Sequence, residues 1–337
     1  MRRLPILAVM IGFLLSACTP TIMEPGPRIT EARLDTDAIV ADDGVRLPLR
    51  SWLPPGDPEA VVIGLHGFND YSLAFDDPGK VLAEAGIAVY AYDQRGFGAA
   101  PDTGYWAGEK AMTDDLIAAI RLLSARYPGK PLYLLGESMG GAVVMVTMAR
   151  PDAPKVAGII LSAPAVWGRT SMSIVQRAAL WIASHTMPWM TLTGRGLHIR
   201  PSDNIDMLRR LSRDPLVIKE TRVDAIHGLC DLMDDAARSP AKLHVATLLL
   251  YGDNDEVVPA EPTLAAMAAL PDDPKAATHA LYASGYHMLL RDLEAKIVLN
   301  DIIAWIRNPA APLPSGADQR ANDRLADCVK SGELPAR

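Results

Sequence analysis

The sequence, 337 residues long, lacks several features that mark other classes of protein. It has only three cysteines, which excludes a disulfide-rich scaffold, and no Cys and His residues have the spacing of metal ligands. No G-x-G-x-x-G stretch follows a predicted strand, so no dinucleotide site is expected. The 33 Lys and Arg residues are outnumbered by 40 Asp and Glu, and no basic patch is visible. We therefore expect no cofactor, no metal and no nucleic-acid partner.

The chain also lacks an apolar run long enough to cross a membrane, which takes about 20 residues. The apolar stretch from Leu4 to Leu15 is too short, and it follows two arginines, as in a secretory signal peptide. The residues Leu15-Ser16-Ala17-Cys18 resemble the lipobox of bacterial lipoproteins, in which the cysteine thiol carries a diacylglyceryl group. We therefore expect Cys18 to be lipidated; a plain signal peptide with a coincidental cysteine is the alternative.

This N-terminus predicts a lipid-anchored protein of the bacterial cell envelope. Thr19 follows the cysteine in place of Asp, which by analogy with enterobacterial sorting favours the outer membrane, with the protein facing the periplasm. An oxidising compartment permits a disulfide between Cys230 and Cys328, but one lies in the predicted cap and the other in the tail. Their pairing stays open, as does the oligomeric state.

Strand and helix patterns alternate along most of the chain, which predicts an α/β fold with a mostly parallel sheet and helices on both faces. Strands are expected near 38–53, 61–65, 88–92, 131–135, 156–162, 245–251 and 276–282, and helices near 77–85, 110–125, 140–149, 260–269 and 288–307. The alternation stops between 166 and 243, a segment too long for a plain crossover, which predicts a helical cap. The expected organisation is a signal peptide at 1–17, a tether at 18–36, a core at 37–165 and 244–308, a cap at 166–243 and a loosely packed C-terminal tail at 309–337.

One motif points to chemistry. Gly136-Glu137-Ser138-Met139-Gly140 fits the G-x-S-x-G nucleophile elbow, in which a serine occupies a sharp turn between a strand and a helix. An apolar strand pattern precedes it and a small apolar helix pattern follows, as the elbow requires. The two glycines permit close packing while the serine adopts a strained conformation. We therefore expect Ser138 to be a nucleophile; the alternative is a tight turn whose serine caps a helix.

A base and an orienting acid are expected after the serine, in the order Ser, Asp or Glu, His. His287 lies in a glycine-containing loop before a helix and is the expected base, whereas His279 lies in an expected edge strand and is expected to face solvent. Asp253, Asp255 and Glu256 all follow a buried strand, at the edge where open α/β sheets place their sites. We favour Asp255 as the acid, with Asp253 as the second choice.

The oxyanion hole is expected at another strand end, where the strand at 61–65 runs into His66-Gly67-Phe68. The backbone amide of Phe68 and that of Met139, the residue after the nucleophile, would receive the oxyanion. His66 itself is expected to be a buried structural imidazole that orients the loop.

Together these motifs resemble the monoacylglycerol lipase and lysophospholipase branch of the α/β-hydrolase superfamily, which is serine aminopeptidase S33-like. The similarity spans Asp42 to Trp305 and is carried by His66-Gly67, Tyr92 to Gly98, Leu135 to Gly141, Gly252 with Asp255, and Tyr286-His287. The family often has His-Gly-x-Gly at the oxyanion turn, Asp-His-x-Gly-His-Gly after the fourth strand, and His where this chain has Glu137. This chain has Phe68-Asn69 and Gln94-Arg95-Gly96-Phe97 at the first two places.

The resemblance implies the α/β-hydrolase fold and a serine ester hydrolase that acts on single-chain lipids such as monoacylglycerols or lysophospholipids. A lipid or small ester is thus the expected partner, with the membrane reached through the lipid anchor. In the cap, the apolar pattern from Ser171 to Met190 suggests that Trp181, Trp189 and Met190 contact an acyl chain, unless this helix simply packs on the core. A short-chain esterase, an aminopeptidase or an acyltransferase would need the same residues, and a lipid carrier without chemistry is a further alternative.

Overall fold

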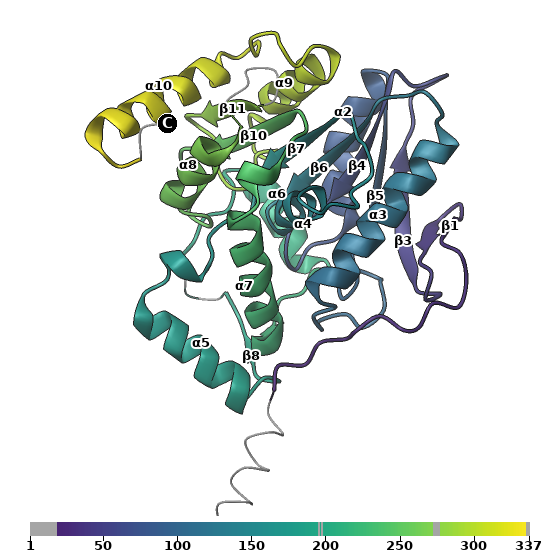
Figure 1. The fold of residues 1–337 in the computed structure, drawn as a ribbon, viewed down its shortest axis with the longest axis vertical. Coiled ribbons are helices and arrows are strands. Elements are labelled where there is room, and N and C mark those ends of the chain that lie inside the picture. The colour runs from purple at the N-terminus through teal and green to yellow at the C-terminus, as the bar shows by residue number, and fades with distance from the viewer. Residues whose placement is uncertain (1–18, 195, 197, 272–276, 335–337) are drawn as a thin grey trace, which may run out of the picture.

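The computed structural model describes residues 19–194, 196, 198–271 and 277–334 (Figure 1). The predicted signal peptide and Cys18 lie outside the described residues. Within the described part, no helix is both long enough and apolar enough to cross a membrane.

The described strands form a nine-stranded sheet in the order β1-β2-β3-β5-β4-β6-β7-β10-β11. The strands from β5 to β11 in this order pair in parallel, whereas β1, β2 and β3 add an antiparallel margin. All residues of β4, β5, β6, β7 and β10 are buried, as expected for parallel strands covered on both faces. The bounds are β1 Arg33–Leu34, β2 Ala38–Val40, β3 Arg46–Trp52, β4 Ala60–Leu65, β5 Ile87–Tyr92, β6 Leu132–Glu137, β7 Gly158–Ser162, β10 Thr247–Gly252 and β11 Ala277–Tyr282.

Helices cover both faces of this sheet, which confirms the predicted α/β class. One hydrophobic cluster includes side chains of α3, α4 and α8, and a second cluster, on the other face, includes side chains of α2 and α9. The bounds are η1 Ser72–Phe75, α2 Asp76–Glu84, α3 Glu109–Arg126, α4 Met139–Met148, α8 Ala260–Ala269 and α9 Ala295–Arg307. The helix expected from residue 288 begins only at Ala295, because turns occupy the residues before it.

The C-terminal segment corrects two expectations. It is not a loosely packed tail, because Ala317–Ser331 forms α10, which packs along the edge strand β11 (Figure 1). The Arg320 side chain donates from Nε to the Leu281 carbonyl at 3.0 Å, and Cys328 is buried in this contact region. His279, expected to face solvent, is only 8% exposed. Covering a sheet edge with a helix protects strand groups that would otherwise pair with another chain.

The predicted helical insertion is present between β7 and β10. Its elements are η2 Arg169–Ser171, α5 Ile174–Thr186, β8 Thr191–Leu192, α6 Ile205–Arg213, β9 Thr221–Arg222, α7 Val223–Ala237 and η3 Pro240–Lys242. The helix α7 packs on α4 of the core, and α5 packs on α7 as an outer layer. A capping box between Ser173 and Gln176 starts α5, which explains why this helix begins later than the apolar pattern from Ser171 suggested. Cys230 on α7 and Cys328 on α10 are both free thiols.

Candidate active site

Ser138 lies at a strained turn between β6 and α4. Its φ of 54° and ψ of −116° lie outside the regions that ordinary residues prefer, as the nucleophile elbow requires. The turn is compact: a Cβ on Gly140 would lie 2.1 Å from the Leu65 carbonyl oxygen, and one on Gly136 would lie 2.5 Å from the Gly140 oxygen. Only glycine fits these two positions. The Ser138 amide donates to the Ser162 carbonyl of β7 at 2.9 Å, and the residue remains partly accessible.

A histidine and a carboxylate meet at the same edge of the sheet. His287 Nδ1 lies 2.8 Å from Asp255 Oδ2, and both side chains are buried. The other Asp255 oxygen accepts from the amides of Val257 and Val258, at 2.7 and 2.9 Å, which fixes the carboxylate at the end of β10.

Among the three competing carboxylates, the geometry therefore pairs Asp255 with His287. Asp253 is exposed. Glu256 is exposed too, and its Oε2 accepts from the Arg200 amide at 2.7 Å. The catalytic role of Asp255 stays a prediction, but its placement agrees with the sequence.

The turn after β4 brings the expected oxyanion loop against the elbow. A Cβ on Gly67 would lie 3.4 Å from the Ser138 Cβ, so the two loops are in contact. The Phe68 ring packs edge-on against Phe97, with ring centres 5.6 Å apart. Met139 is the first residue of α4, so its amide belongs to the positive end of a helix. Phe68 thus belongs to the loop that contacts the elbow, and Met139 directly follows the nucleophile; the role of their amides as oxyanion donors stays a prediction.

His66 is fully buried, as expected for a structural imidazole. Its Nε2 accepts from the Gln94 amide at 3.0 Å, and the Gln94 side-chain amide donates to the His66 carbonyl at 2.9 Å. Burial lowers the pKa of His66, so the ring is held neutral. Gln94, one of the residues in which this chain departs from the family pattern, thus fixes the oxyanion loop.

The structure adds a buried ion-pair cluster that the sequence patterns did not reveal. Arg291 Nη1 lies 2.8 Å from Asp70 Oδ2, and Nη2 lies 2.9 Å from Glu137 Oε2. All three side chains are at most 8% exposed. The available signal for this cluster was Glu137. It is a charged residue at the end of the apolar run of β6, at a position where the family often has His. Its partner is 154 residues away in the chain, so no local pattern identifies it.

Burial and neighbouring charges both shift the pKa values in this cluster. It raises the pKa of Glu137, against the lowering effect of Arg291, while the charge of Asp70 raises that pKa further. For Arg291, burial acts to lower the pKa, but the charges of Glu137 and Asp70 outweigh it and the net shift is upward. The guanidinium therefore remains charged between the two carboxyl groups.

The loop that carries His287 is also held by the cap. Asp292 accepts from the Tyr286 amide at 2.8 Å and from the Ser202 hydroxyl at 2.6 Å. Burial raises the pKa of Asp292 to about 6, although the bond from Ser202 opposes this shift. The Asn204 side chain donates to the Arg291 carbonyl at 2.9 Å. The returning segment of the cap is therefore fastened directly onto the histidine loop.

The cap residues expected to contact an acyl chain lie on or near the surface. Trp181 is 60% exposed and Trp189 is 57% exposed, while Met190 is half-buried. The Trp181 ring stacks on His185, with centres 4.6 Å apart, and His185 in turn contacts His227 of α7. The walls of a closed pocket are buried, so these exposed rings do not have that environment here. Contact with an acyl chain stays a prediction.

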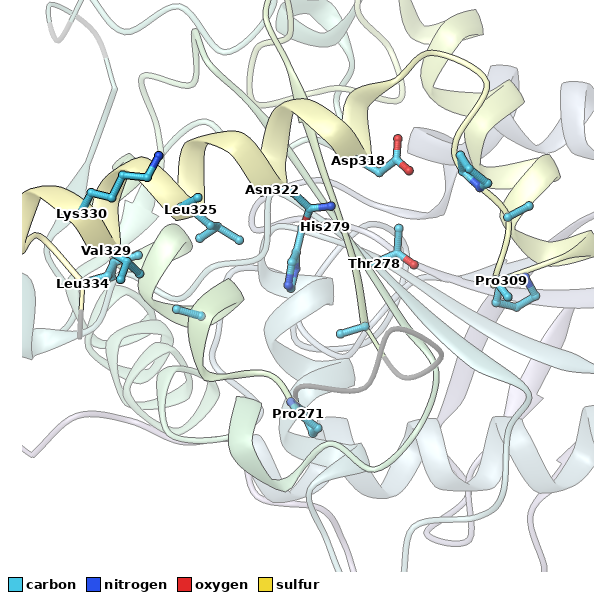
Figure 2. Close-up of a pocket in the computed structure, with 16 residues that line it drawn as sticks. Pro271, Thr278, His279, Pro309, Asp318, Asn322, Leu325, Val329, Lys330 and Leu334 are labelled. Carbon is cyan, nitrogen blue, oxygen red and sulfur yellow. The ribbon is translucent and has the colours of Figure 1, made fainter. Parts of the chain in front are cut away.

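A large cavity lies elsewhere. It measures about 710 Å³ and lies between α10 and the first residues of β11, and its lining includes Leu325, Val329, Thr278 and His279 (Figure 2). In contrast, Ser138, Asp255 and His287 all follow the carboxyl ends of their strands. The cavity therefore lies at the amino ends of the strands, and the candidate site lies at their carboxyl ends. Within the described residues, no group of three or more His, Cys, Asp or Glu side chains is placed to hold a metal ion.

Comparisons with known proteins identify the family of the chain. A family model described as serine aminopeptidase, S33, matches residues 56–294. The monoacylglycerol lipase of Mycolicibacterium smegmatis is 27% identical over 277 residues, covering 78% of this chain and 93% of the relative. The human monoglyceride lipase is 27% identical over 305 residues, covering 86% of this chain and 96% of the relative.

Solved structures show the same fold. A Paleococcus ferrophilus monoacylglycerol lipase superimposes with a TM-score of 0.65 at 24% identity, covering 77% of this chain and 98% of that one. A soluble variant of the Saccharomyces cerevisiae monoglyceride lipase, in complex with a substrate analogue, gives a TM-score of 0.68 at 17% identity, covering 86% and 97%. The chain has the α/β-hydrolase fold, as the resemblance implied.

Proposed function

The chain belongs to the family described as serine aminopeptidase, S33, and we propose that this member hydrolyses carboxylic esters of single-chain lipids, monoacylglycerols or lysophospholipids, through an acyl-enzyme. It is a hydrolase of the lipase and esterase type. The lipid substrate is supported by the names of its relatives, several of which are monoglyceride lipases. The triad is supported by one observation above all: the 2.8 Å contact between His287 and Asp255 at the edge that carries the elbow.

In the proposed mechanism, Ser138 Oγ attacks the ester carbonyl carbon while His287 takes its proton. Because His287 Nδ1 is engaged by Asp255, the proton passes to Nε2. The oxyanion is received by the amides of Phe68 and Met139. The imidazolium then protonates the departing alcohol, glycerol or a glycerophosphoryl group, and the acyl chain remains on the serine. A water molecule, deprotonated by the same imidazole, releases the fatty acid.

The experiment that tests this function compares substrates on one enzyme preparation. Nitrophenyl esters of rising chain length, a monoacylglycerol, a lysophospholipid and an aminoacyl amide would be assayed with the wild type and with Ser138→Ala. We expect the highest kcat/KM on the single-chain lipids, and we expect loss of both turnover and fluorophosphonate labelling in the variant. Preference for acetyl esters would indicate a short-chain esterase, preference for the amide an aminopeptidase, and ester exchange without free acid an acyltransferase.

We also propose that the protein is lipid-anchored in the bacterial envelope, with the cap towards the bilayer. The chain enters the described fold beside Trp106, to which Ile22 forms a β-bridge. The Trp106 indole packs closely on Gly228 of α7, the helix that carries α5. The outer helix exposes apolar side chains, and in Figure 1 it lies at the same end of the molecule as the start of the described chain. These side chains are Ile174, Val175, Trp181 and Ile182.

A single substitution tests the anchor. Cys18→Ser should move the protein from the detergent phase to the aqueous phase on phase partitioning, because no diacylglyceryl group can be attached. Partitioning of the wild type into the aqueous phase after normal signal cleavage would remove the lipoprotein assignment. That outcome would leave the proposed chemistry unaffected.

A further inference from the structure

We propose that Arg291 is a positioning residue for the hydrolytic reaction: one buried guanidinium holds together the three loops that carry the nucleophile, the base and an oxyanion donor. The inference rests on the proposed function, because it takes the roles of Ser138 and His287 as given. It adds a device through which this chain fixes the geometry of its site.

The positions of the three partners along the chain are the first argument. Asp70 comes two residues after Phe68, and Glu137 immediately precedes Ser138. Arg291 follows His287 in the same loop, before α9 begins. A contact from Arg291 to both carboxylates therefore links the oxyanion loop, the elbow and the histidine loop at once.

The geometry of the contacts is the second argument. Each carboxylate uses one oxygen on a separate Nη atom of Arg291, so the guanidinium spans the gap between two loops. The planar guanidinium reaches the two carboxylates with two separate nitrogen atoms, whereas a lysine ammonium has a single nitrogen for both. The Tyr71 amide donates to Asp70 Oδ1 at 2.9 Å, which orients that carboxylate within its own loop.

Incomplete hydrogen bonding is the third argument. Among the described residues, Arg291 Nε and Glu137 Oε1 are buried without a hydrogen-bond partner. Asp70 Oδ2 lies 2.8 Å from Arg291 Nη1 as an ion pair but accepts no hydrogen bond of good geometry. A buried ion cluster that served stability alone would be expected to satisfy its donors and acceptors. Unsatisfied polar groups concentrate where function constrains the structure. The cluster therefore connects the three loops although some of its own polar atoms lack hydrogen bonds.

Three variants test the inference. Arg291→Met removes the contacts to both carboxylates, and Arg291→Lys keeps the positive charge without the branched guanidinium. The triple variant Arg291→Met/Glu137→Gln/Asp70→Asn removes all charges together. The melting temperature, kcat and KM on a soluble short-chain ester, and the rate of fluorophosphonate labelling at Ser138 would be measured for each. The matched control is Arg95→Met, which breaks another buried arginine cluster whose carboxylates, Asp43 and Asp115, belong to none of the three loops.

We expect Arg291→Met to lower kcat and the labelling rate by about 10²-fold, the usual effect of a misplacement of about 1 Å, with KM nearly unchanged. Arg291→Lys should fall between this variant and the wild type. The triple variant should regain most of the lost melting temperature, because it leaves no unpaired buried charge, and yet remain slow. If Arg291→Met does not fold, the other two variants decide.

Wild-type kcat and labelling rate in a folded triple variant would overturn the inference, since the cluster would then only stabilise the fold. Equal losses of kcat in Arg95→Met, measured below its melting temperature, would overturn it as well. Failure of the proposed function looks different: the wild-type protein would then label at a residue other than Ser138.

Discussion

Two buried arginines, Arg95 and Arg291, each lie between two carboxylates, and they differ in how completely they are bonded. Arg95 makes two bonds to Asp43, at 2.6 and 3.1 Å, and two to Asp115, at 2.6 and 2.9 Å. Every carboxylate oxygen in that cluster accepts from the guanidinium. Arg291 reaches only one oxygen of each partner, and atoms of the cluster remain unsatisfied.

The two clusters contain the same kinds of charged groups, but they join different parts of the molecule. The Arg95 cluster joins the loop after β5, the start of α3 and the N-terminal strand region, all of them parts of the core. Bidentate contacts are the strong form of an arginine–carboxylate pair, so this cluster is built for stability. The Arg291 cluster joins the loops of the candidate site, so we expect its loss to be seen first in rate.

The largest effect should come from the group that orients the base, at the edge that Arg291 holds together. Asp255→Asn should lower kcat by about 10⁴-fold, because the imidazole loses the partner that fixes its tautomer. Asp253→Asn is the matched control and should retain most activity, since that side chain is exposed. Esterase assays of both variants check the prediction. A dead Asp253→Asn with an active Asp255→Asn would reverse the assignment.

Next in size is the loss of the saturated cluster. Arg95→Met should lower the free energy of unfolding by about 3 to 5 kcal/mol, because two buried aspartates lose their cation. The kcat of the folded variant should stay close to that of the wild type. Urea unfolding and esterase assays on the same preparation measure the two quantities. A stable but slow Arg95→Met variant would abolish the distinction between the two clusters.

A smaller effect is expected from the two exposed tryptophans of the cap. If Trp181 or Trp189 contacts the acyl chain, its replacement by Ala should reduce the preference for long over acetyl esters by about 1 to 3 kcal/mol. Trp→Phe at the same positions is the control, since it keeps a large ring. The ratio of kcat/KM values along an ester series is the measurement. Equal losses on all chain lengths would mean that the exposed tryptophans have no selective contact with substrate.

The smallest effect should come from a pair of carboxyl groups at the contact between core and cap. Glu109 at the start of α3 hydrogen-bonds with Asp235 of α7, and this contact joins core and cap. Burial and then Asp235 raise the pKa of Glu109 from 4.5 to about 7. The folded state therefore holds this proton more tightly than the unfolded chain. Its stabilising contribution is complete below pH 4.5 and is lost as the pH rises to about 7.

Glu109→Gln tests this directly, because the amide keeps the shape and never ionises. The variant should gain stability relative to the wild type between pH 4.5 and about 7, and keep that advantage above. Urea unfolding across this pH range measures the difference. A difference that does not vary with pH would show that the pair carries no shared proton.

The sequence alone was informative wherever the signal is local. The G-x-S-x-G motif located the elbow, and the apolar runs located the buried strands to within a few residues. The order of serine, acid and histidine reduced the candidates for the acid to three neighbouring residues, Asp253, Asp255 and Glu256. The burial of His66 was also predicted, since this residue directly follows a buried strand. These features depend on residues that are close in the chain.

The predictions for the C-terminal tail and for His279 were wrong, because both depend on residues that are distant in the chain. Residues 309–337 are rich in Pro, Ala and charge, which suggested weak packing, but α10 is stabilised by its contact with β11. The same contact region buries His279, whose strand had suggested exposure. Propensity and composition are weak guides when a long-range contact decides the outcome.

The sequence by itself thus determined the fold class, the elbow serine and the order of the other groups. Only the tertiary structure decided that Asp255, and neither Asp253 nor Glu256, contacts His287, and that Arg291 lies between Asp70 and Glu137. The physical reason is distance along the chain. Periodicity and turn chemistry report on neighbours, whereas an ion pair between residues 154 positions apart exists only after the sheet has brought its strand ends together.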